Sequence, residues 1–325
     1  MPINDTLTLA QTIFKRSLKL MGNRFEISVV ADEEDEGWAN NCIDAAIDEI
    51  QRIERLLTTF SDNSQTYFIN ANAGIKPVEV DKEMFDIIQR AIKISDLTQG
   101  AFDITYGSMD KRFWNFDRSM KTLPDAKTAK KMARLVNYKN IILDKEQATV
   151  FLKEKGMRIG FGSIGKGYAT ERAKYILKQN GVENGIVNAA GDLTTWGYQP
   201  NGKPWTIGAA NSTSIHQLFS YLNITDMTIA TSGNFEKFAM VDGINYSPAI
   251  DPETGMPVQG IKCTTIISPS AEIATALATP VMITGIKAGL DMVNKMKNIA
   301  CIIIDEQYNI YTSKNINLAL ATIKK

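Results

Sequence analysis

The stretch Ile159–Arg172 reads Ile-Gly-Phe-Gly-Ser-Ile-Gly-Lys-Gly-Tyr-Ala-Thr-Glu-Arg and joins a glycine-rich turn to a helical segment. Its first three glycines let backbone N–H groups approach a ligand closely, because glycine has no side chain in the way. Lys166 then begins a helix-like run to Leu177, and a helix N-terminus and an ammonium group both attract anions. The stretch predicts a phosphate-binding turn, with a purely structural turn and a surface lysine as the alternative.

The spacing of these glycines separates the turn from the common nucleotide-binding motifs. It is neither Gly-x-x-x-x-Gly-Lys-Ser/Thr nor a clean Gly-x-Gly-x-x-Gly after a strand. The usual nucleotide folds are therefore not indicated.

The composition of the chain limits the classes of function. The 325 residues are 44% hydrophobic and 22% charged, typical of a globular protein with a large core. Lys plus Arg and Asp plus Glu number 36 each, which argues against a nucleic-acid-binding surface. The three cysteines stand far apart among apolar residues, which favours buried side chains over disulfides. A single histidine, His216, excludes a histidine-based metal cluster.

The chain shows no membrane-spanning or export segment. No apolar run approaches the 18 residues that a transmembrane helix needs, and the N-terminus lacks the pattern of a signal peptide. We expect a cytoplasmic protein, or a periplasmic or membrane-anchored one if an export segment has been removed.

The hydrophobic periodicity predicts an α+β fold with helices early and strands mixed in later. Residues 1–20 form a weak leading segment, for which a helix is suggested. Residues 21–325 form a single domain, or two lobes with a cleft between them. The expected helices are 38–57, 82–97, one beginning at Pro124, 166–177, 271–284 and 289–296. The expected strands are 25–30, 140–143, 148–152, 185–190, 205–209, 227–230, 238–241, 301–304 and 309–312.

Four further loops place polar side chains where a ligand could bind. They carry Asp103 after a helix end, Asp192 after an apolar strand, Ser232 at another strand end, and Asp251 in the turn Asp-Pro-Glu-Thr-Gly-Met-Pro. Each loop alone is typical of an ordinary turn, and Asp251 is expected to make an Asx hydrogen bond.

Taken in order, these segments resemble the ApbE family, the FAD:protein FMN transferases once described as thiamine-biosynthesis lipoproteins. The resemblance runs from Met21 to about Thr312. The segments that carry it are Met21-Gly-Asn-Arg-Phe, Leu57-Thr-Thr-Phe-Ser, Gly100-Ala-Phe-Asp-Ile-Thr-Tyr-Gly, Trp114-Asn-Phe, Gly165-Lys-Gly-Tyr-Ala-Thr-Glu-Arg, Ala190-Gly-Asp, Ala230-Thr-Ser-Gly and Ile250-Asp-Pro-Glu-Thr-Gly-Met-Pro.

The resemblance implies a mixed-sheet fold with helices packed around a flavin-binding cleft. It implies that FAD is cleaved with Mg²⁺, that FMN passes to a threonine of a partner flavoprotein, and that AMP is released. Lys166 would contact the pyrophosphate, and the metal would be held by the Ser163 carbonyl, the Thr279 hydroxyl and, at the position of a carboxylate, Thr275. The flavin site would comprise Met21, Phe60, Ala101, Phe102, Asp103, Lys166 and Ile250.

Three positions depart from the family pattern. Gly160 replaces a flavin-contacting Asp, Pro248 replaces an active-site His, and Thr275 replaces the metal-binding Asp. Mg²⁺ usually has at least one carboxylate ligand, so a threonine is a poor replacement. Glu272, one helical turn earlier, is an alternative ligand only if the helix shifts. His216 is expected to be an exposed loop residue rather than a displaced catalytic one.

Two functional hypotheses follow, and a third is weaker. The chain is an active FAD:protein FMN transferase with an unusual metal site, or a degenerate relative that binds FAD or acts as a scaffold. A generic α+β domain with structural glycine turns is the third alternative, and the ordered series of motifs argues against it.

Overall fold

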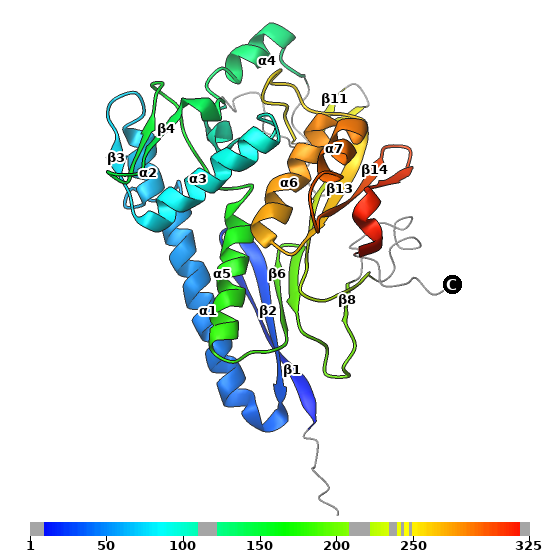
Figure 1. Cartoon of the computed structure of the whole chain (residues 1–325). Helices are drawn as coiled ribbons and strands as arrows, with labels where there is room; N and C mark the ends of the chain where they lie inside the picture. Colours follow the sequence, from blue (N-terminus) through cyan, green and yellow to red (C-terminus); the bar gives the residue numbers. More distant parts are fainter. Residues whose placement is uncertain are drawn as a thin grey trace, which may run out of the picture.

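A computed structural model describes residues 10–109, 122–207, 222–233, 239–241, 244–246 and 249–318, and Figure 1 traces the chain. Its centre is an eight-stranded sheet of order β1-β2-β6-β7-β10-β13-β14-β15, in which all neighbouring strands are antiparallel. The strands are β1 Gln11–Leu20, β2 Asn23–Asp32, β6 Gly185–Ala189, β7 Asp192–Trp196, β10 Thr228–Gly233, β13 Ile261–Ser268, β14 Ala300–Asp305 and β15 Ile310–Thr312.

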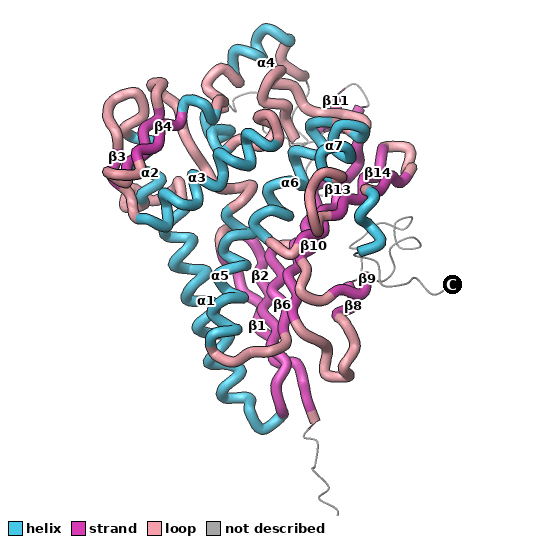
Figure 2. The backbone as a smooth tube through the Cα atoms, in the orientation of Figure 1, coloured by secondary structure: helices cyan, strands magenta, loops and turns pink. Residues whose placement is uncertain are grey.

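Three helices pack on one face of this sheet, where Figure 2 shows them beside the strands. They are α1 Glu36–Leu57, α5 Gly165–Gln179 and α6 Ala271–Thr284. In α1 the buried residues recur every three or four positions, as an amphipathic helix requires. They join side chains of β2 and β6 in the main core, so the sheet and these helices form one packed unit.

The opposite face of the sheet carries a smaller apolar cluster. Val30, Ile229 and Ile267 pack there against a two-stranded sheet of β8 Trp205–Ile207 and β9 Leu222–Ile224. The sheet is therefore covered on both faces, as the high apolar content of its central strands requires.

A second group of elements lies beyond α1 and α5 and shares the main core with them. It contains α2 Gln65–Ala71, α3 Lys82–Leu97, α4 Ala126–Met132 and a small sheet of β3 Val78–Glu79, β5 Thr149–Leu152 and β4 Ile141–Asp144. The remaining elements are α7 Ile286–Val293, the pair β11 Ala239–Val241 and β12 Ile244–Tyr246, and the 3₁₀ turns η1 Glu33–Asp35, η2 Ile104–Ser108, η4 Tyr138–Asn140 and η5 Lys314–Leu318.

The structure confirms the α+β class and most of the expected elements. The helix suggested within residues 1–20 is wrong, because residues 11–20 form the edge strand β1. Exposed and half-buried residues alternate along β1, and Phe14 and Leu18 pack on the core while Lys15 and Lys19 face solvent. This period of two is typical of a strand with one covered face.

Two helix boundaries also differ from the prediction. α4 begins at Ala126 rather than Pro124, because the Asp125 side chain accepts hydrogen bonds from the N–H groups of the first turn. α7 begins three residues before the predicted position, since Gly285, at φ 83°, ends α6 and leads directly into it. The three cysteines are buried and free, as expected. Within the described ranges, no helix combines the length and apolarity needed to cross a membrane.

Candidate functional site

The glycine-rich turn lies where several loops meet at the start of α5. The Gly160 N–H donates to the Ile104 carbonyl over 2.8 Å, which ties the turn to the loop after α3. A Cβ at Gly165 would lie 3.2 Å from Leu57 of α1 and 3.6 Å from the Met21 methyl carbon. The turn thus brings the β1–β2 hairpin, the end of α1 and the Gly100–Thr105 loop together.

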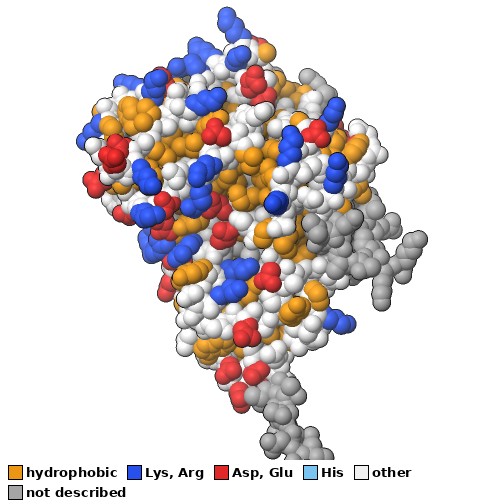
Figure 3. All heavy atoms as spheres, viewed as in Figure 1, with side chains coloured by type: hydrophobic (Ala, Val, Ile, Leu, Met, Phe, Trp, Pro, Cys, Tyr) orange, Lys and Arg blue, Asp and Glu red, His pale blue; other side chains and the backbone are white. Residues whose placement is uncertain are grey.

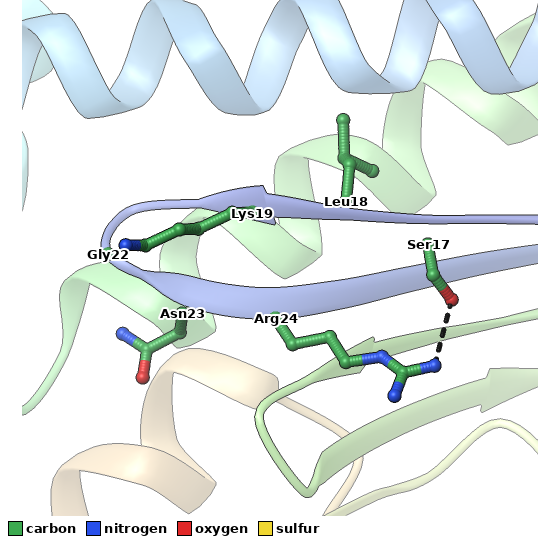
Figure 4. A pocket seen from close by; sticks show the side chains of 6 residues that line it. All are labelled: Ser17, Leu18, Lys19, Gly22, Asn23 and Arg24. Carbon is green, nitrogen blue, oxygen red and sulfur yellow. Dashed lines mark hydrogen bonds between the residues drawn. The ribbon is translucent and has the colours of Figure 1, made fainter.

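Met21 and Gly22 form the two-residue connection between β1 and β2. Their φ angles of 50° and 73° are both positive, as a type I′ hairpin turn requires. Figure 4 shows a hollow beside this turn, lined by Ser17, Leu18, Lys19, Gly22, Asn23 and Arg24. The turn presents Met21 to the start of α5 on one side and borders this hollow on the other.

Asp103 organises the loop that precedes η2. One carboxylate oxygen accepts bonds from the Thr105 N–H and hydroxyl, at 2.7 and 2.6 Å, and the other accepts from the Tyr138 N–H at 2.8 Å. Burial raises the pKa of Asp103, and these hydrogen bonds oppose the shift. Both oxygens therefore have partners within the protein, and Asp103 fixes the backbone of the predicted flavin loop.

Lys166 and Asp192 face each other across the start of α5. The Lys166 Nζ lies 3.6 Å from Asp192 Oδ2, and Asp192 Oδ1 accepts a 3.1 Å bond from the Thr231 N–H. The Lys166 and Asp192 side chains are 26% and 16% exposed, so a ligand can still reach them. Burial raises the pKa of Asp192, and the nearby ammonium opposes this. The pair gives the site one positive and one negative group.

The residues expected to hold a metal form a neutral set. The Thr279 hydroxyl hydrogen-bonds the Ser232 hydroxyl at 3.0 Å, while the Thr275 hydroxyl donates to the Ala271 carbonyl of its own helix at 3.0 Å. Ser163 lies exposed in the turn. Mg²⁺ prefers carboxylate oxygen, and no group of three acidic, histidine or cysteine side chains with metal-site geometry occurs in the described ranges. These donors do not fit a strong Mg²⁺ site.

Glu272, the alternative metal ligand, and the turn carboxylate Asp251 both have hydrogen-bond partners of their own. Both Glu272 oxygens bond to the Arg90 guanidinium, at 2.7 and 2.9 Å, in a partly buried contact between α6 and α3. Asp251 accepts from the Glu253 N–H and the Thr254 hydroxyl, both at 2.9 Å, which confirms the predicted Asx turn. The suggestion that Glu272 replaces the metal carboxylate is therefore not supported by its position.

The remaining predicted residues differ in exposure. Phe60 is 98% exposed, and its neighbour Thr59 lies 3.8 Å from the position of a Cβ at Gly160. Phe102 and Ile250 are each 2% exposed, so their side chains belong to the core and a ligand can meet only their backbone. Ala101 is half-buried. Trp114, His216 and Pro248 lie outside the described residues.

Sequence reasoning missed the close approach of α5 and α6. A Cβ at Gly167 would lie 2.3 Å from the Thr275 hydroxyl oxygen and 2.4 Å from the Ala271 carbonyl oxygen. Only glycine fits at this crossing between α5, which carries Lys166, and α6, which carries Thr275. The signal was Gly167, a glycine inside the helix-like run that begins at Lys166.

Comparison with known proteins matches this arrangement to one family. The ApbE family profile matches residues 21–303. The chain belongs to the ApbE family. It is 30% identical over 266 residues to a FAD:protein FMN transferase of Klebsiella pneumoniae, covering 81% of this chain and 82% of that protein. It is 24% identical over 315 residues to a FAD:protein FMN transferase of Haemophilus influenzae, covering 93% and 89%.

Solved structures of ApbE proteins share the fold. The ApbE protein of Thermotoga maritima superposes with a TM-score of 0.83 at 26% identity, covering 96% of this chain and 100% of that one. The apo form of the Pseudomonas stutzeri flavinyl transferase ApbE gives 0.82 at 21% identity, covering 97% and 99%. The ApbE-like fold expected from the sequence is thus confirmed.

Proposed function

We propose that this chain is a FAD:protein FMN transferase, which moves FMN from FAD to a threonine hydroxyl of a partner protein and releases AMP. The observation that carries the proposal is the meeting of Lys166, Met21 and the Gly100–Thr105 loop at the start of α5. The relatives that match this chain are named FAD:protein FMN transferases.

The residues of this site have separate tasks in the proposed reaction. The Lys166 ammonium and the N-terminus of α5 bind the pyrophosphate and offset the charge that develops on its oxygens. The Asp103 hydrogen bonds hold the loop that would receive the flavin. Met21, Phe60, Ala101 and the backbone of Phe102 and Ile250 complete the proposed flavin site. Positioning and charge stabilisation carry most of the catalysis in such transfers.

Magnesium remains an expectation of the family resemblance alone. When bound, it would supply a positive charge to the reacting phosphoryl group, but the neutral donors Ser163, Thr275 and Thr279 do not fit it well.

A second candidate, a member that binds FAD without transferring FMN, is favoured by this neutral donor set. Both candidates predict FAD binding that depends on Lys166, and only the first predicts AMP release. Titration of the whole chain with FAD, followed by measurement of AMP release with and without Mg²⁺, separates them.

A lysine-to-methionine pair tests the site itself. Lys166→Met should weaken FAD binding about tenfold to a hundredfold, since a hydrogen bond to a charged group contributes roughly 1.5–3 kcal/mol. Lys178→Met, in the last turn of the same helix and exposed, is the matched control and should bind FAD as the unmodified chain does. Equal FAD affinity in the two variants would show that Lys166 is not the pyrophosphate contact.

A further inference from the structure

Four carboxylates in the segments described above differ in how many of their oxygens accept a hydrogen bond. Those of Asp103, Asp251 and Glu272 have hydrogen-bond partners on both oxygens. Asp192 has one such partner, the Thr231 N–H on Oδ1. Its Oδ2 faces the Lys166 ammonium at 3.6 Å, beyond normal hydrogen-bond distance. Asp192 is therefore the carboxylate with an oxygen left to accept a proton.

The surroundings of Asp192 suit a proton acceptor. Its side chain is 16% exposed, so a substrate hydroxyl can reach it while most of its surface is shielded from water. Burial raises its pKa, which makes the carboxylate a stronger base than a solvated one. Among the described residues, Lys166 is the charged group that acts on it, and this ammonium opposes the rise in the Asp192 pKa that burial causes.

We propose that Asp192 is the general base that removes the proton from the acceptor hydroxyl, an inference that rests on the proposed transferase function. The hydroxyl oxygen attacks the FMN phosphorus and forms the new P–O bond. The bond from that phosphorus to the bridging oxygen breaks, and AMP leaves with its electron pair. Asp192 Oδ2 takes the hydroxyl proton and returns it to solvent or to the departing phosphate.

The distances around Lys166 allow this step. A phosphate oxygen bonded to the ammonium lies about 2.8 Å from Nζ. Asp192 Oδ2 lies 3.6 Å from the same nitrogen, so the two oxygens are within roughly 6 Å of each other. That interval accommodates one hydroxyl that donates to the carboxylate and approaches the phosphorus. The ammonium thus brings the electrophile and the base together.

The contact also predicts an effect on binding. In the free protein the Lys166 ammonium faces Asp192. An incoming pyrophosphate must therefore compete with Asp192 for this ammonium. Asp192→Asn removes this competition and keeps an oxygen that can accept from the Thr231 N–H. FAD affinity should therefore stay the same or increase, while the rate of transfer falls.

The experiment measures FAD affinity and AMP release from FAD over a pH series, with water or N-acetylthreonine amide as acceptor. We expect Asp192→Asn to lower kcat about a hundredfold or more, the usual contribution of a general base, and to abolish the fall in rate toward acidic pH. Asp192→Glu should restore part of the rate. Asp226→Asn is the matched control, because Asp226 is exposed and has a φ of 53° that Asn tolerates.

The outcomes are distinguishable. An unchanged kcat in Asp192→Asn, a loss expressed only in KM, or recovery of its rate by excess Mg²⁺ would each overturn the assignment of Asp192 as base. Absence of AMP release from the unmodified chain would refute the proposed transferase function, and the role of Asp192 with it.

Discussion

Gly167 allows a sharp test of how the two helices of the site are held together. Its substitution by alanine would place a methyl group 2.4 Å from the Ala271 carbonyl oxygen and 2.3 Å from the Thr275 hydroxyl oxygen. The carbonyl belongs to the backbone of α6 and has no rotamer to relieve the contact. α5 and α6 would have to separate by about 1 Å to restore ordinary van der Waals distances.

The expected magnitude follows from two opposing effects. Crowding of a packed contact costs about 1–3 kcal/mol, whereas glycine to alanine in a helix gains roughly 1 kcal/mol from propensity. We expect Gly167→Ala to lose up to about 2 kcal/mol of unfolding free energy. FAD binding should also weaken, because Lys166 precedes Gly167 on α5 and shifts with this helix.

Chemical denaturation and FAD titration of the variant give both quantities. Gly37→Ala is the matched control, since Gly37 lies in the first turn of α1 with no atom within 4 Å of the added carbon. It should gain up to about 1 kcal/mol and leave FAD binding unchanged. Similar gains in stability for the two variants would refute the close helix contact.

Two further predictions concern stability. In Gly22→Ala the added methyl group has no atom within 4 Å, but the alanine is held at a φ of 73°. The substitution should therefore lower the unfolding free energy by about 1 kcal/mol through backbone strain alone. Gly22→Asn should recover much of this loss in a denaturation experiment. Hydrogen bonds from Arg52 lower the pKa of Glu49 to about 2, from its ordinary 4.5. A carboxylate whose pKa is lower in the folded than in the unfolded chain stabilises the fold above its unfolded pKa. The difference in unfolding free energy between the unmodified chain and Glu49→Gln should therefore shrink as pH falls from about 4.5 toward 2 in acid titrations.

The parts of the fold that the sequence predicted are those with a local signal. The helix 82–97 is found with the predicted bounds, because its apolar residues recur at helical spacing and Asp81 precedes it. β1 was missed because it is an edge strand whose polar residues outnumber its apolar ones, so its period of two is weak. The ordered loop motifs correctly indicated the family without showing which side chains face a ligand.

The parts of the site that the sequence could not show depend on contacts between distant residues. Arg90 and Glu272 are 182 positions apart, and no local pattern in either segment predicts their pairing. This bond shows why Glu272 is a poor metal ligand. Phe102 illustrates the same limit, since family motifs placed it at the flavin while its side chain packs in the core.

Backbone strain coincides with the site at two hairpin turns. Met21 and Ala190 are non-glycine residues at φ values of 50° and 58°, each followed by a glycine. The turns are neighbours, because β2 pairs with β6 and the Ala190 N–H donates to the Arg24 carbonyl at 2.9 Å. Left-handed geometry costs such residues about 1 kcal/mol each, and it persists where the surroundings fix it.

Both turns bring a side chain to the start of α5. One sets the Met21 side chain against the glycine turn, and the other sets Asp192 opposite Lys166. A relaxed loop at either position would separate these side chains from the start of the helix. The strain therefore lies where the start of α5, a cation and a carboxylate are held within a few ångströms of one another.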